Sequence, residues 1–151
     1  MKNIKSIALA LIIVLSTLSV TAQTKKVDAS KSSINWLAKK VTGQHNGTVN
    51  IKDGALVFKG KKLVGGTFTS DMTSLTSTDL TGDWLAKLNG HLKSDDFFGV
   101  EKFPTSTLVF KTIGAKAKDV YTVTADLTIK GITNPVTFDI TVNGNTATTT
   151  L

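Results

Sequence analysis

The feature that most constrains the fold is a strict alternation of apolar and polar side chains over residues 121–129 and 136–142. Apolar residues hold every second position in both stretches, and threonine or aspartate holds the positions between them. A period of two residues is the spacing of a β-strand with one buried and one exposed face. The intervening Gly131–Pro135 has a length that suits a hairpin. The sequence therefore predicts an antiparallel sheet with one apolar face.

Shorter alternating stretches extend this pattern upstream, from Val27 onward. Three turn signals are predicted to separate them: Gly43–Gly47, Asp53-Gly54 and Lys59–Lys62. The pair Gly65-Gly66 begins the next predicted strand, where we expect a bulge or a close backbone approach. The stretch Thr73–Thr81, rich in Ser and Thr, is predicted to be a linker. Near the other end, Asn143-Gly144 predicts a hairpin that leads into a strand beginning at Thr146.

One amphipathic helix is predicted in the middle of the chain, over Asp83–Lys93. Its apolar residues form a single stripe: Trp84, Leu85, Leu88 and Leu92. Either Asp79 or Thr81 is expected to cap its first turn. Pro104 restricts Phe103 to an extended conformation and so marks the start of a new strand. The predicted fold class is all-β with one short helix.

The N-terminus has the organisation of a secretory signal peptide. Lys2 and Lys5 precede the apolar run Ile7–Val20, which is short for a membrane span, and Val20 and Ala22 fit the small-residue positions before a cleavage point. Cleavage is expected between Ala22 and Gln23. The predicted domains are a signal peptide, residues 1–22, and a β-barrel domain, residues 23–151. We therefore expect a periplasmic or secreted protein without a stable membrane anchor after cleavage.

Composition excludes several classes of site and partner. The chain has no cysteine, which excludes disulfides, thiolate metal sites and cysteine nucleophiles. All 18 basic residues are lysines, and loss of Lys2 and Lys5 lowers the formal net charge from +7 to +5. Bidentate recognition of phosphate or guanine favours arginine, and these lysines are scattered between strands. We therefore expect a solvated basic surface and no nucleic-acid partner.

A resemblance to a known family centres on the segment after the predicted helix, HLKSDDFFGVEKFPTSTLVF, His91–Phe110. It is similar to the signature of the YceI-like family of secreted lipocalin-like proteins, D-x-H-L-x-S-x-D-F-F-D-V-x-x-[FY]-P-x-x-x-F. Gly99 stands where that signature has its aspartate after the Phe pair. Further blocks resemble the family in the same order: Val27-Asp28, Ser33–Trp36, Gly43 with His45 and Gly47, and Leu127–Phe138.

The resemblance implies an antiparallel lipocalin-like β-barrel with a helix packed at one end. It also implies binding of a polyisoprenoid chain, such as the tail of a quinone or of a polyprenyl phosphate, inside the barrel. The partner expected from it is an isoprenoid-type lipid, with no other cofactor, and a homodimer is left open. The residues expected to line the barrel are Trp36, Phe58, Phe68, Met72, Phe110, Leu127 and Phe138, with Phe97 and Phe98 filling apolar space at its end.

The residues also allow functions other than lipid binding, and each of these has less support. The same apolar positions would equally fill the core of a structural or interaction domain without a ligand. His45 and His91 could share a metal with Asp95 or Asp96, but their spacing matches no metal-binding motif. No nucleophile motif accompanies the serines. We therefore expect no catalytic residues, no metal site and no enzymatic activity.

The resemblance also predicts that the barrel is incomplete at its C-terminal end. Family members carry further closing strands beyond the point that Thr146–Leu151 reaches. Two interpretations compete: the sequence is a fragment of a longer protein, or the protein is complete with an open barrel. The fragment is favoured, because an open sheet exposes unpaired strand edges and apolar surface.

Overall fold

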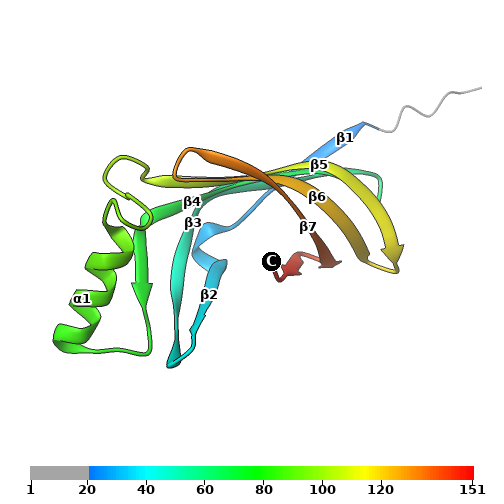
Figure 1. The fold of residues 1–151 in the computed structure, drawn as a ribbon. Coiled ribbons are helices and arrows are strands. Elements are labelled where there is room, and N and C mark those ends of the chain that lie inside the picture. The colour runs from blue at the N-terminus through cyan, green and yellow to red at the C-terminus, as the bar shows by residue number, and fades with distance from the viewer. Residues whose placement is uncertain (1–20) are drawn as a thin grey trace, which may run out of the picture.

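The computed structural model describes residues 21–151, so the predicted signal peptide lies almost wholly outside the described residues. In this part of the chain, eight strands form one antiparallel sheet, joined by one α-helix and one short 3-10 helix (Figure 1). In chain order the elements are β1 (Ala22–Lys26), η1 (Ala29–Lys31), β2 (Ser33–Lys40), β3 (Gly43–Lys59), β4 (Lys62–Ser77), α1 (Gly82–Lys93), β5 (Thr105–Ala117), β6 (Val120–Ile129), β7 (Ile132–Asn143) and β8 (Thr146–Thr149).

The sheet follows the order β1-β3-β4-β5-β6-β7-β8, and β2 pairs with β3 beside β1. Both β1 and β2 pair on β3, with β2 opposite its first half and β1 opposite its second half. Figure 1 shows the sheet arching over, with α1 beside β4 and the C-terminal end below the arch. Among residues 21–151, β8 pairs with β7 alone. The predicted fold class, an all-β, lipocalin-like antiparallel barrel that is incomplete, is confirmed.

Two of the predicted turns are wrong, because β3 runs without a break through both Gly43–Gly47 and Asp53-Gly54. The turn before β3 is Val41-Thr42. The pairing with β4 instead shifts register between Ile51 and Asp53, where the sequence suggested a turn. A bulge of this kind bends a strand without ending it.

The predicted linker Thr73–Thr81 is also wrong over its first half, since β4 continues to Ser77. Threonine is β-branched and favours strands, which outweighs the polar composition of this stretch. Asn89 of α1 joins the helix to the end of β4: its Oδ1 accepts from the Ser77 backbone N–H at 2.9 Å, and its Nδ2 donates to Thr76 Oγ1 at 2.9 Å. The helix was predicted almost to the residue, but its cap residue Thr81 makes no side-chain capping bond.

The hairpin between β6 and β7 is tighter than Gly131–Pro135 suggested. Its two turn residues, Lys130 and Gly131, both have positive φ, 52° and 74°, as a type I′ turn requires. Pro135 lies inside β7 and pairs with Asp126. A proline is tolerated there because β8 reaches only as far as Ile140, so this part of β7 is an edge.

Two groups of buried side chains form the core. The barrel cluster consists of Leu56, Phe58, Leu63, Val123, Ala125, Phe138 and Ile140. The helix cluster, at the α1 end, consists of Val49, Met72, Leu75, Leu92 and Val100. The alternation of β6 and β7 is confirmed by this core, since Val123 and Ala125 on β6 are fully buried and Phe138 and Ile140 on β7 are buried.

Three glycines of the sheet lie beneath aromatic rings. Gly47 pairs with Trp36 and Gly54 with Phe68, and Gly66 lies below the ring of Phe110. A β-carbon at Gly66 would be 2.5 Å from two carbons of the Phe110 ring, and one at Gly54 would be 2.8 Å from Phe68. The expectation of a close approach at Gly65-Gly66 is confirmed. Each ring can lie flat on the sheet because the backbone below it carries no side chain.

Gly66→Ala is therefore expected to destabilise the fold by about 1–3 kcal/mol, because the added carbon displaces the Phe110 ring. Gly114→Ala on β5 is the matched control, since a β-carbon there has no neighbour within 4 Å. Urea unfolding of the two variants measures the difference. Equal stability of the two variants would contradict the tight contact.

Candidate functional site

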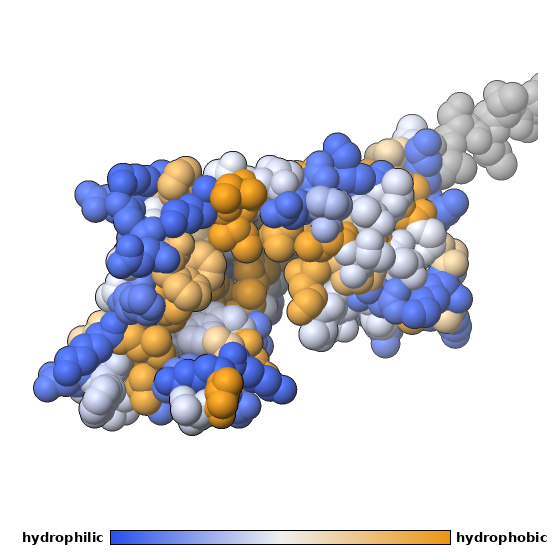
Figure 2. Space-filling model, viewed as in Figure 1, coloured by the Kyte–Doolittle hydropathy of each residue, from blue (hydrophilic) through white to orange (hydrophobic). Residues whose placement is uncertain are grey.

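The candidate site is the inner face of the sheet, meaning the face that carries both clusters. Because the bulge after Ile51 inserts one residue into β3, the inward positions change from Val49 and Ile51 to Gly54, Leu56 and Phe58. The apolar side of β3 therefore stays on one face along its full length. Figure 2 shows a hollow between the end formed by β2, β3 and α1 and the end formed by β6–β8, with apolar surface along its margin.

A row of aromatic rings crosses the inner face. The ring centroids of Phe68 and Phe110 are 5.8 Å apart, as are those of Phe110 and Phe138. Phe58 lies on the same face, and Lys25 Nζ sits 5.3 Å from its ring centroid. Phe58 and Phe138 are buried, whereas Phe68 and Phe110 are only half-buried. Four of the predicted lining residues, Phe58, Phe68, Phe110 and Phe138, are thus brought together on this face.

A second set of predicted residues meets at the α1 end. Met72 is buried in the helix cluster, and Trp36 and Phe98 pack against it. The indole Nε1 of Trp36 is buried without a hydrogen-bond partner among the described residues. This set is separated from the aromatic row along β3, so the predicted lining residues form two groups, one at mid-sheet and one under the helix.

The remaining two predicted residues lie apart from both groups. Leu127 is half-buried and shares the inner face with Val123 and Ala125, but it belongs to neither cluster. Phe97 is 46% exposed. Its ring centroid lies 5.8 Å from that of His91 and 4.8 Å from that of Phe98. Within the Phe pair, Phe98 therefore contacts the core while Phe97 faces outward.

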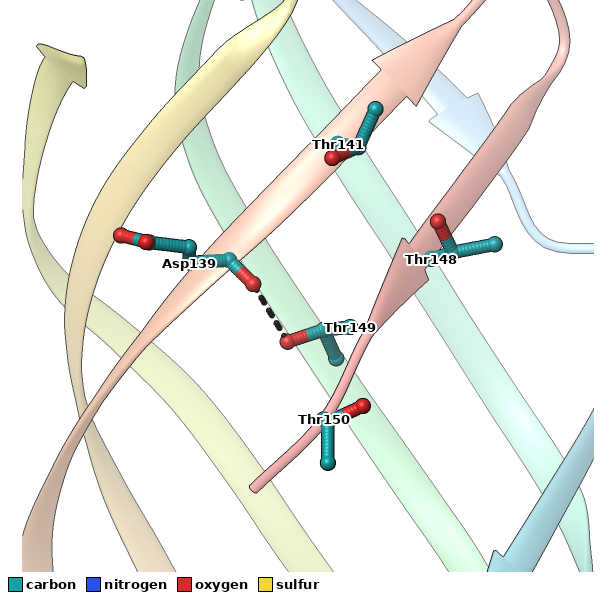
Figure 3. A pocket seen from close by; sticks show the side chains of 5 residues that line it. All are labelled: Asp139, Thr141, Thr148, Thr149 and Thr150. Carbon is teal, nitrogen blue, oxygen red and sulfur yellow. Dashed lines mark hydrogen bonds between the residues drawn. The ribbon is translucent and has the colours of Figure 1, made fainter.

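Two open cavities of the described residues lie away from the inner face. One, of about 420 Å³, lies on the β7–β8 hairpin and is lined by a carboxylate and threonines: Asp139, Thr141, Thr148, Thr149 and Thr150 (Figure 3). The other, of about 590 Å³, lies between the β2–β3 hairpin and α1 and is lined by Lys40, His45, Leu80, Trp84, Lys87 and Leu88. Sequence reasoning predicted neither cavity. It missed the second because it assigned Trp84 to the apolar stripe of the helix and treated the lysines as solvated surface.

A polar network fixes the β2–β3 hairpin to the connection between β4 and α1. Asp79 Oδ1 accepts from Ser77 Oγ at 2.6 Å and from the Asn46 backbone N–H at 3.2 Å. Its Oδ2 lies 2.9 Å from His45 Nδ1. The bond from Ser77, followed by that from His45, lowers the pKa of Asp79 to about 2. The ionised carboxylate thus holds one wall of the cavity between the hairpin and α1.

Neither a cluster of metal-ligand side chains nor a membrane-spanning helix is found in residues 21–151. This part of the chain contains no group of three or more His, Asp or Glu side chains that could hold a metal ion. The His91 ring packs at a tilt against Phe97, while His45 belongs to the network of Asp79. Of the helices in residues 21–151, none is long and apolar enough to cross a membrane.

Comparison with known proteins identifies a family over the whole domain and relatives over part of it. The family described as the YceI-like domain matches residues 26–151. Two UPF0312 proteins of Staphylococcus aureus, from strains USA300 and MRSA252, are 48% and 52% identical to the chain over 56 residues. These segments are 37% of this chain, which spans only 30% of the length of either relative.

A solved structure shares the fold over most of the chain. The crystal structure of BcnA from Burkholderia cenocepacia superposes with a TM-score of 0.60 at 26% sequence identity. The match covers 80% of this chain and 73% of BcnA. The curled sheet with one helix is therefore an arrangement that this solved protein also adopts.

The network around Asp79 predicts a specific acid dependence. Because the pKa of Asp79 is about 2 in the folded chain and near 3.9 when unfolded, its contribution to stability is present above about pH 4 and is lost as the pH falls to about 2. Ser77→Ala removes the largest cause, so the pKa of Asp79 should rise toward its ordinary value. Carboxyl NMR titration of both proteins measures this, and an unchanged pKa in Ser77→Ala would contradict the assigned cause.

Proposed function

This chain belongs to the YceI-like domain family, and from that membership we propose that it is a lipid-binding protein. Its ligand is a polyisoprenoid chain, such as the tail of a quinone or of a polyprenyl phosphate, held on the inner face of the sheet. The protein carries or sequesters this lipid and performs no chemical turnover. It acts in the periplasm or outside the cell after loss of residues 1–22.

The observation that carries this proposal is the row of half-buried aromatic rings on the inner face. Phe68 and Phe110 pack against the barrel cluster with one side, which leaves apolar surface toward the hollow of the sheet. Leu108, Ile113 and Val136 are half-buried in the same way. An apolar surface on the concave side of a sheet suits a long, slender, apolar ligand better than it suits water.

The free energy gained by moving an apolar chain from water onto such a surface is large enough for binding. Each CH₂ group moved out of water contributes roughly 0.8 kcal/mol, so ten groups supply on the order of 8 kcal/mol. That corresponds to an affinity near the micromolar range before the ordering of the chain is subtracted. An isoprenoid tail needs no polar partner, so the apolar face alone is sufficient as a site.

The polar residues support binding without catalysis. The histidines are engaged at the surface, His45 with Asp79 and His91 with Phe97. Asp139 and Asp95 are paired with lysines, Lys116 and Lys102. Carboxylates held in this way at an exposed surface are poorly placed to act together on a substrate lying along the inner face.

A filled core without a ligand is the alternative, and the full burial of Leu63 and Val123 favours it for one part of the interior. Native mass spectrometry of the mature protein from its host separates the two functions. We expect a polypeptide whose mass corresponds to an N-terminus at Gln23. We also expect it to carry a co-purifying apolar ligand or to take up added ubiquinone or menaquinone. A polypeptide that never carries or takes up such a lipid would overturn the proposal.

Substitutions on opposite faces of the sheet locate the bound lipid. Leu127→Asn should weaken ubiquinone binding by about tenfold, because a loss of about 1.4 kcal/mol of apolar contact has that effect. Leu127 belongs to neither cluster, so the fold should survive. Val109→Asn is the control, since Val109 is exposed and precedes the inward Phe110 on β5. Equal affinities of the two variants, with circular dichroism unchanged, would place the lipid elsewhere.

A further inference from the structure

The cavity between the β2–β3 hairpin and α1 combines apolar and basic side chains at one end of the molecule. We call this surface the hairpin–helix cleft, and it consists of the six cavity-lining residues together with Val41: Lys40, Val41, His45, Leu80, Trp84, Lys87 and Leu88. The residues Val41 and Trp84 are 105% and 70% exposed. Figure 2 shows apolar atoms surrounded by hydrophilic ones at this lower end of the molecule.

The exposure of these apolar side chains is not explained by the fold. Val41 is at the tip of a two-residue turn and Trp84 is in the first turn of α1, where a polar residue would be equally compatible with the backbone. Single exposed apolar residues are common, but here an exposed Val and an exposed Trp flank a cleft that also contains Leu80 and Leu88. Such a combination is typical of a surface that binds an apolar partner.

The charges around the cleft select an anionic partner. Lys40 and Lys87 line it, and Lys87 Nζ lies 5.1 Å from the ring centroid of Trp84. The adjacent carboxylate Asp79 is bonded to Ser77, Asn46 and His45. Asp83 is exposed at the start of α1 and is not part of the lining. Positive charge therefore prevails beside the apolar residues.

We propose that the hairpin–helix cleft docks the protein on an anionic phospholipid surface. Tryptophan prefers the boundary between lipid headgroups and acyl chains, and a lysine stem buries its methylenes while its ammonium group reaches the headgroups. Val41 at the hairpin tip enters the apolar layer, and Lys40 and Lys87 contact the phosphates. The biological purpose of this docking rests on the proposed function, since an isoprenoid tail is exchanged with a bilayer. Its physical basis is the cleft alone.

Vesicle flotation tests the docking with the mature protein and no isoprenoid. Vesicles of equal parts phosphatidylglycerol and phosphatidylcholine should bind the protein at low salt, and pure phosphatidylcholine vesicles should bind it much more weakly. Lys40→Gln and Lys87→Gln should each lower the partition coefficient about fivefold, as expected for a basic residue near an anionic membrane. Lys118→Gln, at the turn between β5 and β6, removes the same charge at a distant site and should have little effect.

Paired aspartate substitutions separate position from net charge. Val41→Asp and Ile132→Asp each add one negative charge to an exposed hairpin residue, and Ile132 is 63% exposed at the start of β7. We expect Val41→Asp to abolish flotation and Ile132→Asp to retain it. Equal binding of the two variants, or no binding of the wild-type protein, would overturn the docking surface.

Lipid uptake by the same variants distinguishes this inference from the proposed function. Val41→Asp should still take up ubiquinone supplied without vesicles, because the inner face is unchanged. Vesicle binding without any ubiquinone uptake by the wild-type protein would overturn the proposed function and leave the docking surface standing. Ubiquinone uptake by a wild-type protein that never binds phosphatidylglycerol vesicles would overturn the docking surface and leave the proposed function standing.

Discussion

The fold depends on the requirement that one apolar face stays continuous while the long β3–β4 pair bends. The two strands, of 17 and 16 residues, pair with register shifts at three places. A regular strand alternates its side chains strictly, so a single inserted residue reverses which positions face inward. The apolar residues of β3 change from odd-numbered positions, Val49 and Ile51, to even-numbered ones, Leu56 and Phe58, which compensates for that reversal. The same bulge therefore bends the β3–β4 pair and keeps its apolar residues on one face. The elements β2, β5 and α1 pack along this pair.

Glycines beneath aromatic rings shape the inner face of the sheet. A side chain at Gly47, Gly54 or Gly66 would meet Trp36, Phe68 or Phe110 within 3 Å. With glycine there, each ring lies against the backbone of the neighbouring strand. Large residues on both strands would fill the hollow from opposite sides. The same glycine–aromatic pairs thus hold these rings close to the backbone on the concave side of the sheet.

The parts of this structure that were predictable from sequence are those governed by local pattern. The alternation on β6 and β7, the helix over Asp83–Lys93 and the close approach at Gly66 each depend on a few neighbouring residues, and each was confirmed. The strand through Asp53-Gly54 was not predictable, because a DG pair is compatible with both a turn and a bulge. Only the partner strand β4 decides between them. The cavity beside Trp84 was missed for a similar reason, since a helical stripe does not reveal which of its residues lie beyond the edge of the sheet.

The exclusive use of lysine acquires a physical meaning if the protein exchanges a lipid with a membrane. Arginine binds phosphate through a planar fork of two hydrogen bonds, which holds the phosphate in a fixed geometry. Lysine is a strongly hydrated point charge, and its attraction to a lipid surface is screened within about 8 Å at physiological salt. Lys40 and Lys87 therefore guide the hairpin–helix cleft to an anionic surface without fixing it there. A carrier has to leave the bilayer after loading, and a weak, salt-sensitive contact permits both steps.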